Sequence, residues 1–161
     1  TALNNIYQVR FRNFQLASNN AYRAQETYAS LFRLASAAAS NIPAQRLEEM
    51  QKDIIARMKP ISDQLAEMAG NDENLDEEMD LLRATVKQFL AYQKANTETM
   101  EIAIADYTMA VPYMTVVEKA FGAFRDQLNA LIATKSPTYP ADFVLDDRPD
   151  ALELLEQIRN R

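Results

Sequence analysis

The most constraining feature of the sequence is a run of more than thirty residues, Leu3 to Ala38, that contains neither Gly nor Pro. Small and apolar residues recur along this run in steps of three and four, the spacing of one face of a helix. The predicted stripe, with one charged member, is Leu3, Ile6, Arg10, Phe14, Ala17, Ala21, Ala24, Tyr28, Leu31, Ala35 and Ala38. At about 1.5 Å per residue the helix is roughly 55 Å long and needs equally long partners. A rod-shaped bundle follows.

The composition fits a single helical domain. The chain has 161 residues, of which 48% are hydrophobic, and it holds two Gly and six Pro. Ala, Leu, Glu and Gln are common, whereas the Gly-rich turns of β-hairpins are missing. A chain of this length can bury a sizeable core. We therefore expect an all-α protein, an antiparallel up-down-up-down four-helix bundle.

Three further helices are expected, each bounded by Pro, Gly or Asn. The second begins after Pro43, with Asn41 as a candidate cap, and ends at Gly70; Pro60 predicts a kink. Its predicted core stripe is Leu47, Met50, Ile54, Met58, Ile61, Leu65 and Met68. The third is expected from about Leu75 to Ala110, with the acidic residues around 72–78 at its positive end, and a core stripe of Met79, Leu82, Val86, Phe89, Asn96, Met100, Ala103 and Tyr107.

The fourth helix is expected to start at Pro112, because the residue before a proline disfavours helical geometry. Its predicted stripe is Met114, Val117, Phe121, Phe124, Leu128 and Leu131. Ser136 to Pro140 should end this helix, and Ala151 to Ile158 reads as a short extra C-terminal helix. We therefore divide the chain into a bundle, residues 1–135, and a C-terminal extension, residues 136–161.

The charge and the cysteine content bear on which partners and which cell compartment the chain is expected to have. The formal charge is −6, and Lys and Arg form no cluster, so nucleic acid is not an expected partner. The chain has no Cys, which fits a reducing compartment or a bacterial periplasm equally well. No apolar run approaches the length of a membrane span, so we expect the chain to be soluble as given and any membrane attachment to come from flanking segments.

The chain has no His, which argues against an enzyme, because histidine acid-base catalysis and Ser-His or Cys-His pairs are excluded. The neighbouring carboxylates Glu48-Glu49 and Glu77-Glu78 point in different directions on a helix. The acidic residues 72–80 lack the spaced oxygen ligands and central Gly of an EF-hand loop. We expect no catalytic residues, no metal site and no cofactor.

Aromatic and polar residues are expected to converge at one end of the bundle. Met and Tyr stripes could line a cofactor pocket, but at helical spacing they more commonly fill a core. In an antiparallel bundle the end of the first helix meets the end of the third and the start of the fourth. The residues expected there are Arg33, Tyr107, Thr108, Tyr113 and Thr115.

Several segments resemble the periplasmic four-helix-bundle sensor domain of bacterial methyl-accepting chemotaxis proteins. They are residues 6–14 (IYQVRFRNF), 92–95 (YQKA), 100–109, 110–113 (AVPY), 120–124 (AFGAF) and 128–131 (LNAL), which together span about residues 1–135. The resemblance implies an extracytoplasmic ligand sensor, whose outer helices lead to membrane spans and whose dimer signals to cytoplasmic modules. The interrupted segment 136–150 departs from that pattern.

The resemblance also implies a site for an anionic ligand on arginines of the first helix and groups at the start of the fourth. Arginine offers a fork of donors for a carboxylate, and a helix N-terminus offers free amides. We therefore expect an amino acid, dicarboxylate or aromatic acid to bind Arg23 or Arg33, with Thr27 one turn after Arg23. The residues expected to orient it are Tyr107, Thr108, Tyr113 and Thr115.

Two other interpretations and an assembly stay open at this point. The chain could be the input domain of a sensor histidine kinase, or a ligand-free helical scaffold of the phasin-like kind. The small residues of the first helix, such as Ala17, Ala21 and Ala24, also allow close approach of a second copy. We expect a weak parallel homodimer through that helix.

Overall fold

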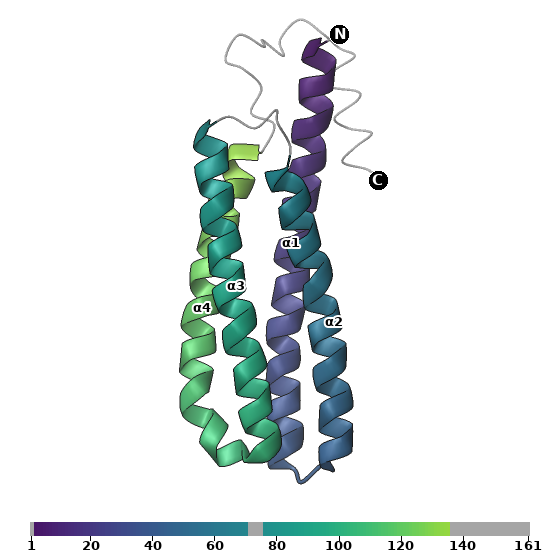
Figure 1. Ribbon diagram of the computed structural model, residues 1–161, viewed down its shortest axis with the longest axis vertical. Helices are drawn as coiled ribbons and strands as arrows, with labels where there is room; N and C mark the ends of the chain where they lie inside the picture. Colours follow the sequence, from purple (N-terminus) through teal and green to yellow (C-terminus); the bar gives the residue numbers. More distant parts are fainter. Residues whose placement is uncertain (1, 71–75, 136–161) are drawn as a thin grey trace, which may run out of the picture.

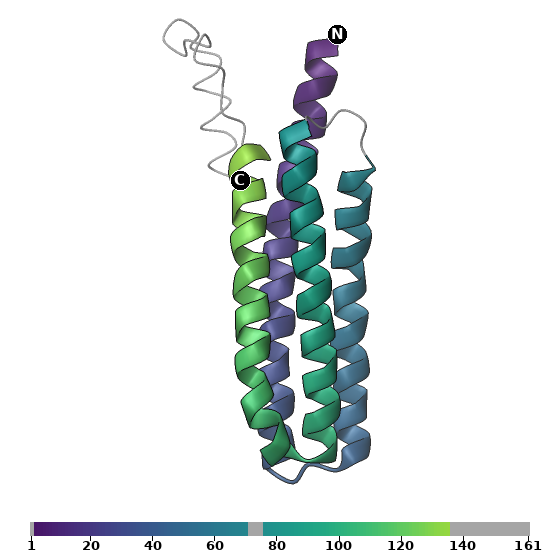
Figure 2. The same ribbon diagram turned by 60° about the vertical axis from the view of Figure 1, so that its left-hand side comes forward.

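The computed structural model describes residues 2–70 and 76–135, and within these residues it contains four helices and no strand. They are α1 (Ala2–Ala39), α2 (Ala44–Ala69), α3 (Asp76–Ala105) and α4 (Tyr107–Lys135). The helices lie side by side and alternate in direction (Figures 1 and 2). The predicted all-α four-helix bundle is therefore confirmed. The acidic segment 71–75, the extra helix at 151–158 and the extension 136–161 lie outside the described residues.

The first connection shows why α1 ends where it does. Asn41 has a positive φ of 59°, a conformation that Asn tolerates better than most residues. The amide of Ile42 donates to Ala37 O (3.2 Å) and that of Asn41 donates to Ala38 O (3.2 Å). These two bonds form a Schellman motif that satisfies the last carbonyls of α1. Asn41 therefore closes α1, and the prediction that it caps the second helix is wrong.

Proline and glycine bound α2 as the sequence predicted, with one interior exception. Pro43 occupies the N-cap position, and Gly70 is the C-cap, whose amide donates to Ala66 O (3.0 Å). Pro60 lies inside α2, which continues through it to Ala69. The lost backbone bond at Pro60 does not end the helix, because Met58, Ile61 and Leu65 around it are fully or almost fully buried.

The turn between α3 and α4 lies at Asp106, not at Pro112 as predicted. Asp106 Oδ1 accepts from the amide of Thr108 (2.9 Å) and from its hydroxyl (2.6 Å). These hydrogen bonds cap the first turn of α4 and lower the pKa of the Asp106 carboxyl. Pro112 then lies in the second turn of α4, where it leaves one carbonyl without its helical donor. The start of α4 is therefore set by the Asp106 side-chain cap and not by Pro112.

The core stripes of α2 and α4 are largely those predicted, and on α1 the predicted Ala17, Ala24 and Leu31 are buried, but the members from Phe14 to Ala35 that alternate with them are each displaced by one residue. Buried on α1 are Asn13, Ala17, Asn20, Ala24, Thr27, Ser30, Leu31 and Leu34, whereas the predicted Phe14, Ala21, Tyr28 and Ala35 are half-buried. Hydropathy favoured the wrong neighbour, since it excludes Asn and Thr from a core. The actual α1 stripe carries a polar residue every seven positions: Asn13, Asn20 and Thr27.

Candidate functional site

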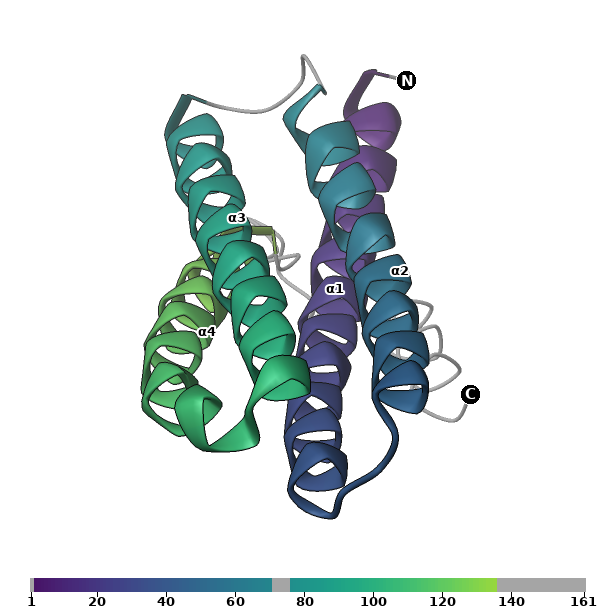
Figure 3. The same ribbon diagram turned by 60° about the horizontal axis from the view of Figure 1, so that its bottom comes forward.

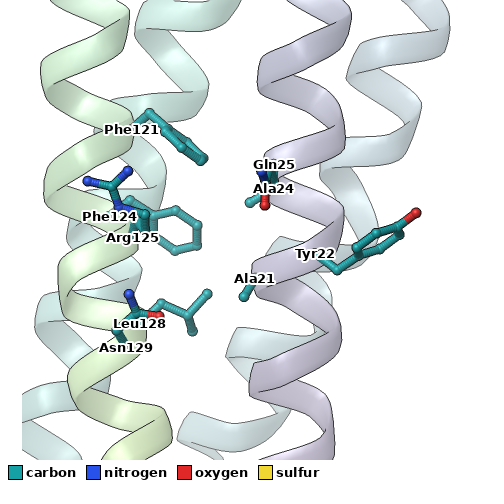
Figure 4. A pocket seen from close by; sticks show the side chains of 9 residues that line it. All are labelled: Ala21, Tyr22, Ala24, Gln25, Phe121, Phe124, Arg125, Leu128 and Asn129. Atoms are coloured by element: carbon teal, nitrogen blue, oxygen red, sulfur yellow. The ribbon is translucent and has the colours of Figure 1, made fainter.

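A groove of about 420 Å³ lies between α1 and α4. The lining residues, drawn in Figure 4, are Ala21, Tyr22, Ala24, Gln25, Phe121, Phe124, Arg125, Leu128 and Asn129. Its volume is within the range of pockets that hold small organic molecules. The groove is therefore the candidate binding site.

Unequal side-chain size explains why the groove exists. On the α1 side its wall consists of Ala21 and Ala24, which reach only a short way from the helix. On the α4 side Phe121, Phe124 and Leu128 face them (Figure 4) and are almost fully buried. A methyl group opposite a ring leaves space that neither helix fills. The floor of the groove is accordingly apolar.

A positive charge lies at the mouth of this apolar floor. The guanidinium carbon of Arg125 is 5.9 Å from the centre of the Phe121 ring, a cation–π distance. Arg125 Nε is 3.7 Å from Asp126 Oδ1, too far for a hydrogen bond. Gln25 and Asn129 add amide groups on the two sides of the groove, and both are exposed. The rim can thus donate several hydrogen bonds to an anion.

Aromatic stacking holds the α4 wall in place. The rings of Tyr28 and Phe121 stack with centroids 4.4 Å apart and planes 6° apart. Phe32 contacts the other side of this pair edge-on to Tyr28 (5.0 Å). Burial, and next the nearby charge of Glu118, raises the pKa of the Tyr28 hydroxyl, so the ring stays neutral at ordinary pH. The stacked Tyr28 ring therefore holds the Phe121 ring, which lies beside the Arg125 guanidinium, in a fixed position.

Thr27, one of the predicted ligand residues, is in the interior. It is 0% exposed and its hydroxyl donates to Ala24 O (2.7 Å). Its oxygen is 2.8 Å from Tyr92 Oη, which accepts from Asn96 Nδ2 (3.0 Å). Since the Thr27 hydrogen is used at Ala24, Tyr92 must donate to Thr27. Arg23, one turn before Thr27 on α1, is exposed, so these two predicted ligand residues lie in different environments.

The two predicted arginines lie on the surface and apart from the groove. Arg23 lines a shallower depression of about 330 Å³ between α1 and α2, with Tyr22, Glu26, Arg57 and Pro60. Tyr22 lines both this depression and the α1–α4 groove. Arg33 is exposed near the end of α1. Neither arginine lines the α1–α4 groove.

The four predicted residues of α4 lie at the expected end of the bundle. Figure 3 shows the α1–α2 connection and the α3–α4 turn at the same end. Tyr107, Thr108, Tyr113 and Thr115 are all exposed there. The α4 start is now at Tyr107, and the Thr108 amide already bonds Asp106, so the free amides expected beside Tyr113 are not there. A ligand role for these residues stays a prediction.

Sequence reasoning missed Arg125, although a weak signal for it existed. Arg125 directly follows Phe124 of the predicted core stripe, and Asn129 lies one turn later. Residues beside a core stripe border the neighbouring helix. Which neighbour they face depends on the α1–α4 alignment, and no local pattern specifies that alignment. Sequence alone therefore could not show that Arg125 borders the groove, because the tertiary alignment of α1 and α4 decides this.

In 2–70 and 76–135, no three His, Cys, Asp or Glu residues are grouped to hold a metal ion. In the same ranges, each helix is too short or too polar to cross a membrane.

Comparison of the chain with protein-family models, curated protein sequences and solved structures finds no match.

Proposed function

We propose that this bundle is a small-molecule-sensing domain that binds an organic carboxylate in the α1–α4 groove. The observation that carries the proposal is Arg125 at the mouth of a groove whose accessible apolar lining includes Ala21 and Phe121. Arginine pairs with carboxylates through two parallel hydrogen bonds, and an apolar floor favours the hydrocarbon part of the same ligand. A half-exposed ion pair alone contributes little, so both parts are needed.

The arrangement of the helix ends supports a receptor. The start of α1 and the end of α4 lie at the same end of the bundle (Figure 1). Both ends could therefore continue into the same membrane, as the resemblance to chemotaxis sensor domains implies. Ligand bound between α1 and α4 would contact the two helices that make those connections. We propose the periplasmic part of a bacterial chemoreceptor, with the input domain of a sensor histidine kinase as the related alternative.

A thermal-shift screen of amino acids, dicarboxylates and aromatic acids tests the proposal. A ligand that binds only the folded state raises the melting temperature, and the rise grows with ligand concentration. The hit should lose about tenfold or more in affinity in Arg125→Gln, consistent with the loss of a charge-assisted pair. Arg23→Gln is the matched control on the other face. Loss of binding in Arg23→Gln or Arg33→Gln, but not in Arg125→Gln, would return the site to the residues that the sequence suggested.

A second candidate, the ligand-free scaffold or interaction protein, is favoured by one specific observation. The first turns of α4 expose Tyr107, Met109, Val111, Tyr113 and Val116, each at least 40% exposed. Met109, Tyr113 and Val116 lie on one side of the helix, and exposed apolar side chains grouped in this way commonly mark a contact with another molecule. A screen in which no carboxylate raises the melting temperature, with partner capture lost in Met109→Ser and Val116→Ser, would favour this candidate.

The predicted homodimer through α1 stays a proposal on changed grounds. Ala17 and Ala24 are buried within their own chain, so they cannot contact a second copy. A dimer would have to use exposed α1 residues such as Phe11 and Phe32. Sedimentation with and without the carboxylate hit would show it, and a monomer at millimolar concentration in both states would exclude it.

A further inference from the structure

The interior of the bundle carries polar side chains at one position in seven on two helices. On α1 these are Asn13, Asn20 and Thr27, and on α3 they are Glu78, Thr85, Tyr92 and Thr99, all buried. α1 and α3 run in the same direction, since each is antiparallel to α2 (Figure 1). Thr27 contacts Tyr92 (2.8 Å). Seven residues back on both helices, about 10.5 Å along the axis, Asn20 is therefore level with Thr85.

The two levels differ in how their polar atoms are satisfied. At the Thr27–Tyr92 level, both hydroxyl groups are paired in a chain of hydrogen bonds that starts at Asn96 Nδ2, and among the described residues only Asn96 Oδ1 of this chain has no partner. At the next level Asn20 is 0% exposed, and neither its Nδ2 nor its Oδ1 has a hydrogen-bond partner among the described residues. The hydroxyl of Thr85 donates to Leu81 O (2.7 Å), which leaves its oxygen as an acceptor.

Gln64 of α2 brings a further acceptor to the Asn20 level. Its Oε1 is buried and has no hydrogen-bond partner among the described residues. Arg57 Nη1 donates to Ser30 Oγ (3.4 Å), and Arg12 pairs with Glu67, so these contacts bracket the α1–α2 alignment. Between these two contacts, Gln64 lies level with the stretch of α1 that includes Asn20. Gln64 is also one heptad after Arg57 and so lies on the side of α2 that faces α1.

We propose that the layer of Asn20, Gln64 and Thr85 is a buried hydration site, in which ordered water completes the hydrogen bonds of Asn20. Water fits because the layer offers Nδ2 as a donor and three oxygens as acceptors. A water accepts from Asn20 Nδ2 and donates to Gln64 Oε1 and Thr85 Oγ1, or to Asn20 Oδ1. Buried waters typically make about three such bonds to otherwise unpaired groups.

Small neighbours on α1 leave room for this water. Asn20 lies between Ala17 and Ala24 on the buried stripe, and both alanines are at most 1% exposed. Their methyl groups fill less of the interior than the Leu31 and Leu34 that follow them on the same stripe. An amide left without any partner in such a place is costly, and native interiors contain few of them. Hydration relieves that cost without moving a helix.

The experiment counts long-lived water in solution by ¹⁷O magnetic relaxation dispersion. The parent protein is compared with Asn20→Leu, which keeps the side chain's approximate volume, and with Asn19→Leu. Asn19 is the adjacent asparagine and is exposed, so it is the matched control. We expect the Asn20→Leu protein to lose the signal of at least one water and to unfold at a higher urea concentration. Asn19→Leu should keep the parent's water count.

A second measurement on the unchanged protein decides the matter even if Asn20→Leu does not fold. Proton exchange-edited NMR should show cross-peaks between water and the Asn20 side-chain amide, with the sign of a water that stays for nanoseconds or longer. An Asn20 amide without such a cross-peak would overturn the proposal. A crystal structure in which Asn20 bonds directly to Gln64 or Thr85 would do the same.

Discussion

Helix α4 contacts α3 and α1 differently over part of its length. Towards α3 it packs ring on ring: Phe124 is 5.3 Å from Phe89 and 6.2 Å from Tyr92, measured between ring centroids. Towards α1 it also packs ring on ring where Phe121 stacks on Tyr28, but beyond that pair it faces Ala21 and Ala24, and the groove of about 420 Å³ is left there. Along the groove, the two interfaces of α4 thus differ by the size of the opposing side chains.

Because the α3 side of α4 is close-packed and part of its α1 side is not, the bundle can be stable and still hold a ligand. Close-packed rings on the α3 side contribute dispersion and apolar burial, which fix α4 in place. The α1 side gives up part of that contact area. A site built this way keeps its shape before the ligand arrives, because the α3–α4 interface does not depend on it. Changes to the two interfaces should therefore have different consequences.

The largest expected effect is on the close-packed α3–α4 interface. Phe124→Ala removes a fully buried ring that contacts Phe89 and Tyr92. We expect the free energy of unfolding to fall by about 3–5 kcal/mol, the usual cost of deleting a buried aromatic ring. Urea unfolding followed by circular dichroism measures it. A loss below about 1 kcal/mol would mean that the α3–α4 interface is not the close-packed one.

The second effect is a pH dependence that belongs to the same interface. Burial raises the pKa of Tyr92 to about 12 from 10.0, and its hydrogen bonds with Thr27 and Asn96 offset part of that rise. Between these values the unfolded chain has lost the proton that the folded chain keeps. The free energy of unfolding should therefore decrease as the pH rises from 10 towards 12, at the steepest by about 1.4 kcal/mol per pH unit.

Urea unfolding at a series of pH values from 8 to 11.5 measures this slope, and Tyr92→Phe should reduce it. The part that remains comes from other tyrosines, among them Tyr28, whose pKa is raised as well. An unchanged slope in Tyr92→Phe would show that Tyr92 does not titrate as a buried group.

The third effect is that of the Tyr92 hydroxyl at neutral pH. Tyr92→Phe keeps the ring contacts but removes the group that accepts from Asn96 and donates to Thr27. We expect a loss of about 1–2 kcal/mol, because Asn96 is left with an unpaired buried donor. Tyr22→Phe on the exposed surface is the control and should be close to neutral. Equal losses in the two variants would argue against the buried hydrogen-bond chain.

The smallest effect on stability is expected at the α1–α4 interface, which contains the groove. Ala21→Leu adds apolar atoms on the α1 wall of the groove, where space exists for them. Stability should change by less than about 1 kcal/mol, since the new side chain buries apolar area without displacing a neighbour. Carboxylate binding should be lost all the same. A strongly destabilised Ala21→Leu protein would mean that α1 and α4 are already in close contact there.

The sequence predicted the helices well and the interior of α1 badly, for the same reason. Three- and four-residue spacing predicts which segments are helical, and the α2 stripe from Leu47 to Met68 followed hydropathy. On α1 the buried face includes Asn13, Asn20 and Thr27, so hydropathy selected Phe14 and Tyr28 instead. A buried polar side chain is compatible with a core only if partners are present, and partners come from other helices.

The candidate site was less predictable than the fold. The α3–α4 turn depended on a cap from Asp106 to Thr108, which a proline six residues after Asp106 obscured in the sequence. The groove depends on which side chains of α1 stand opposite Arg125, and that alignment is a property of the folded chain. Only the size pattern, alanines on one helix and phenylalanines on the other, was visible beforehand.

Mapping the amides that respond to an organic carboxylate shows whether it binds between α1 and α4. ¹⁵N-labelled protein is titrated with benzoate and with the strongest carboxylate from the thermal-shift screen, and amide chemical shifts are followed. We predict saturable shifts concentrated at residues 21–25 and 121–129, which disappear in Arg125→Gln and in Ala21→Leu. Saturable shifts concentrated instead around Arg33 and residues 107–115, or none with any carboxylate, would contradict the account.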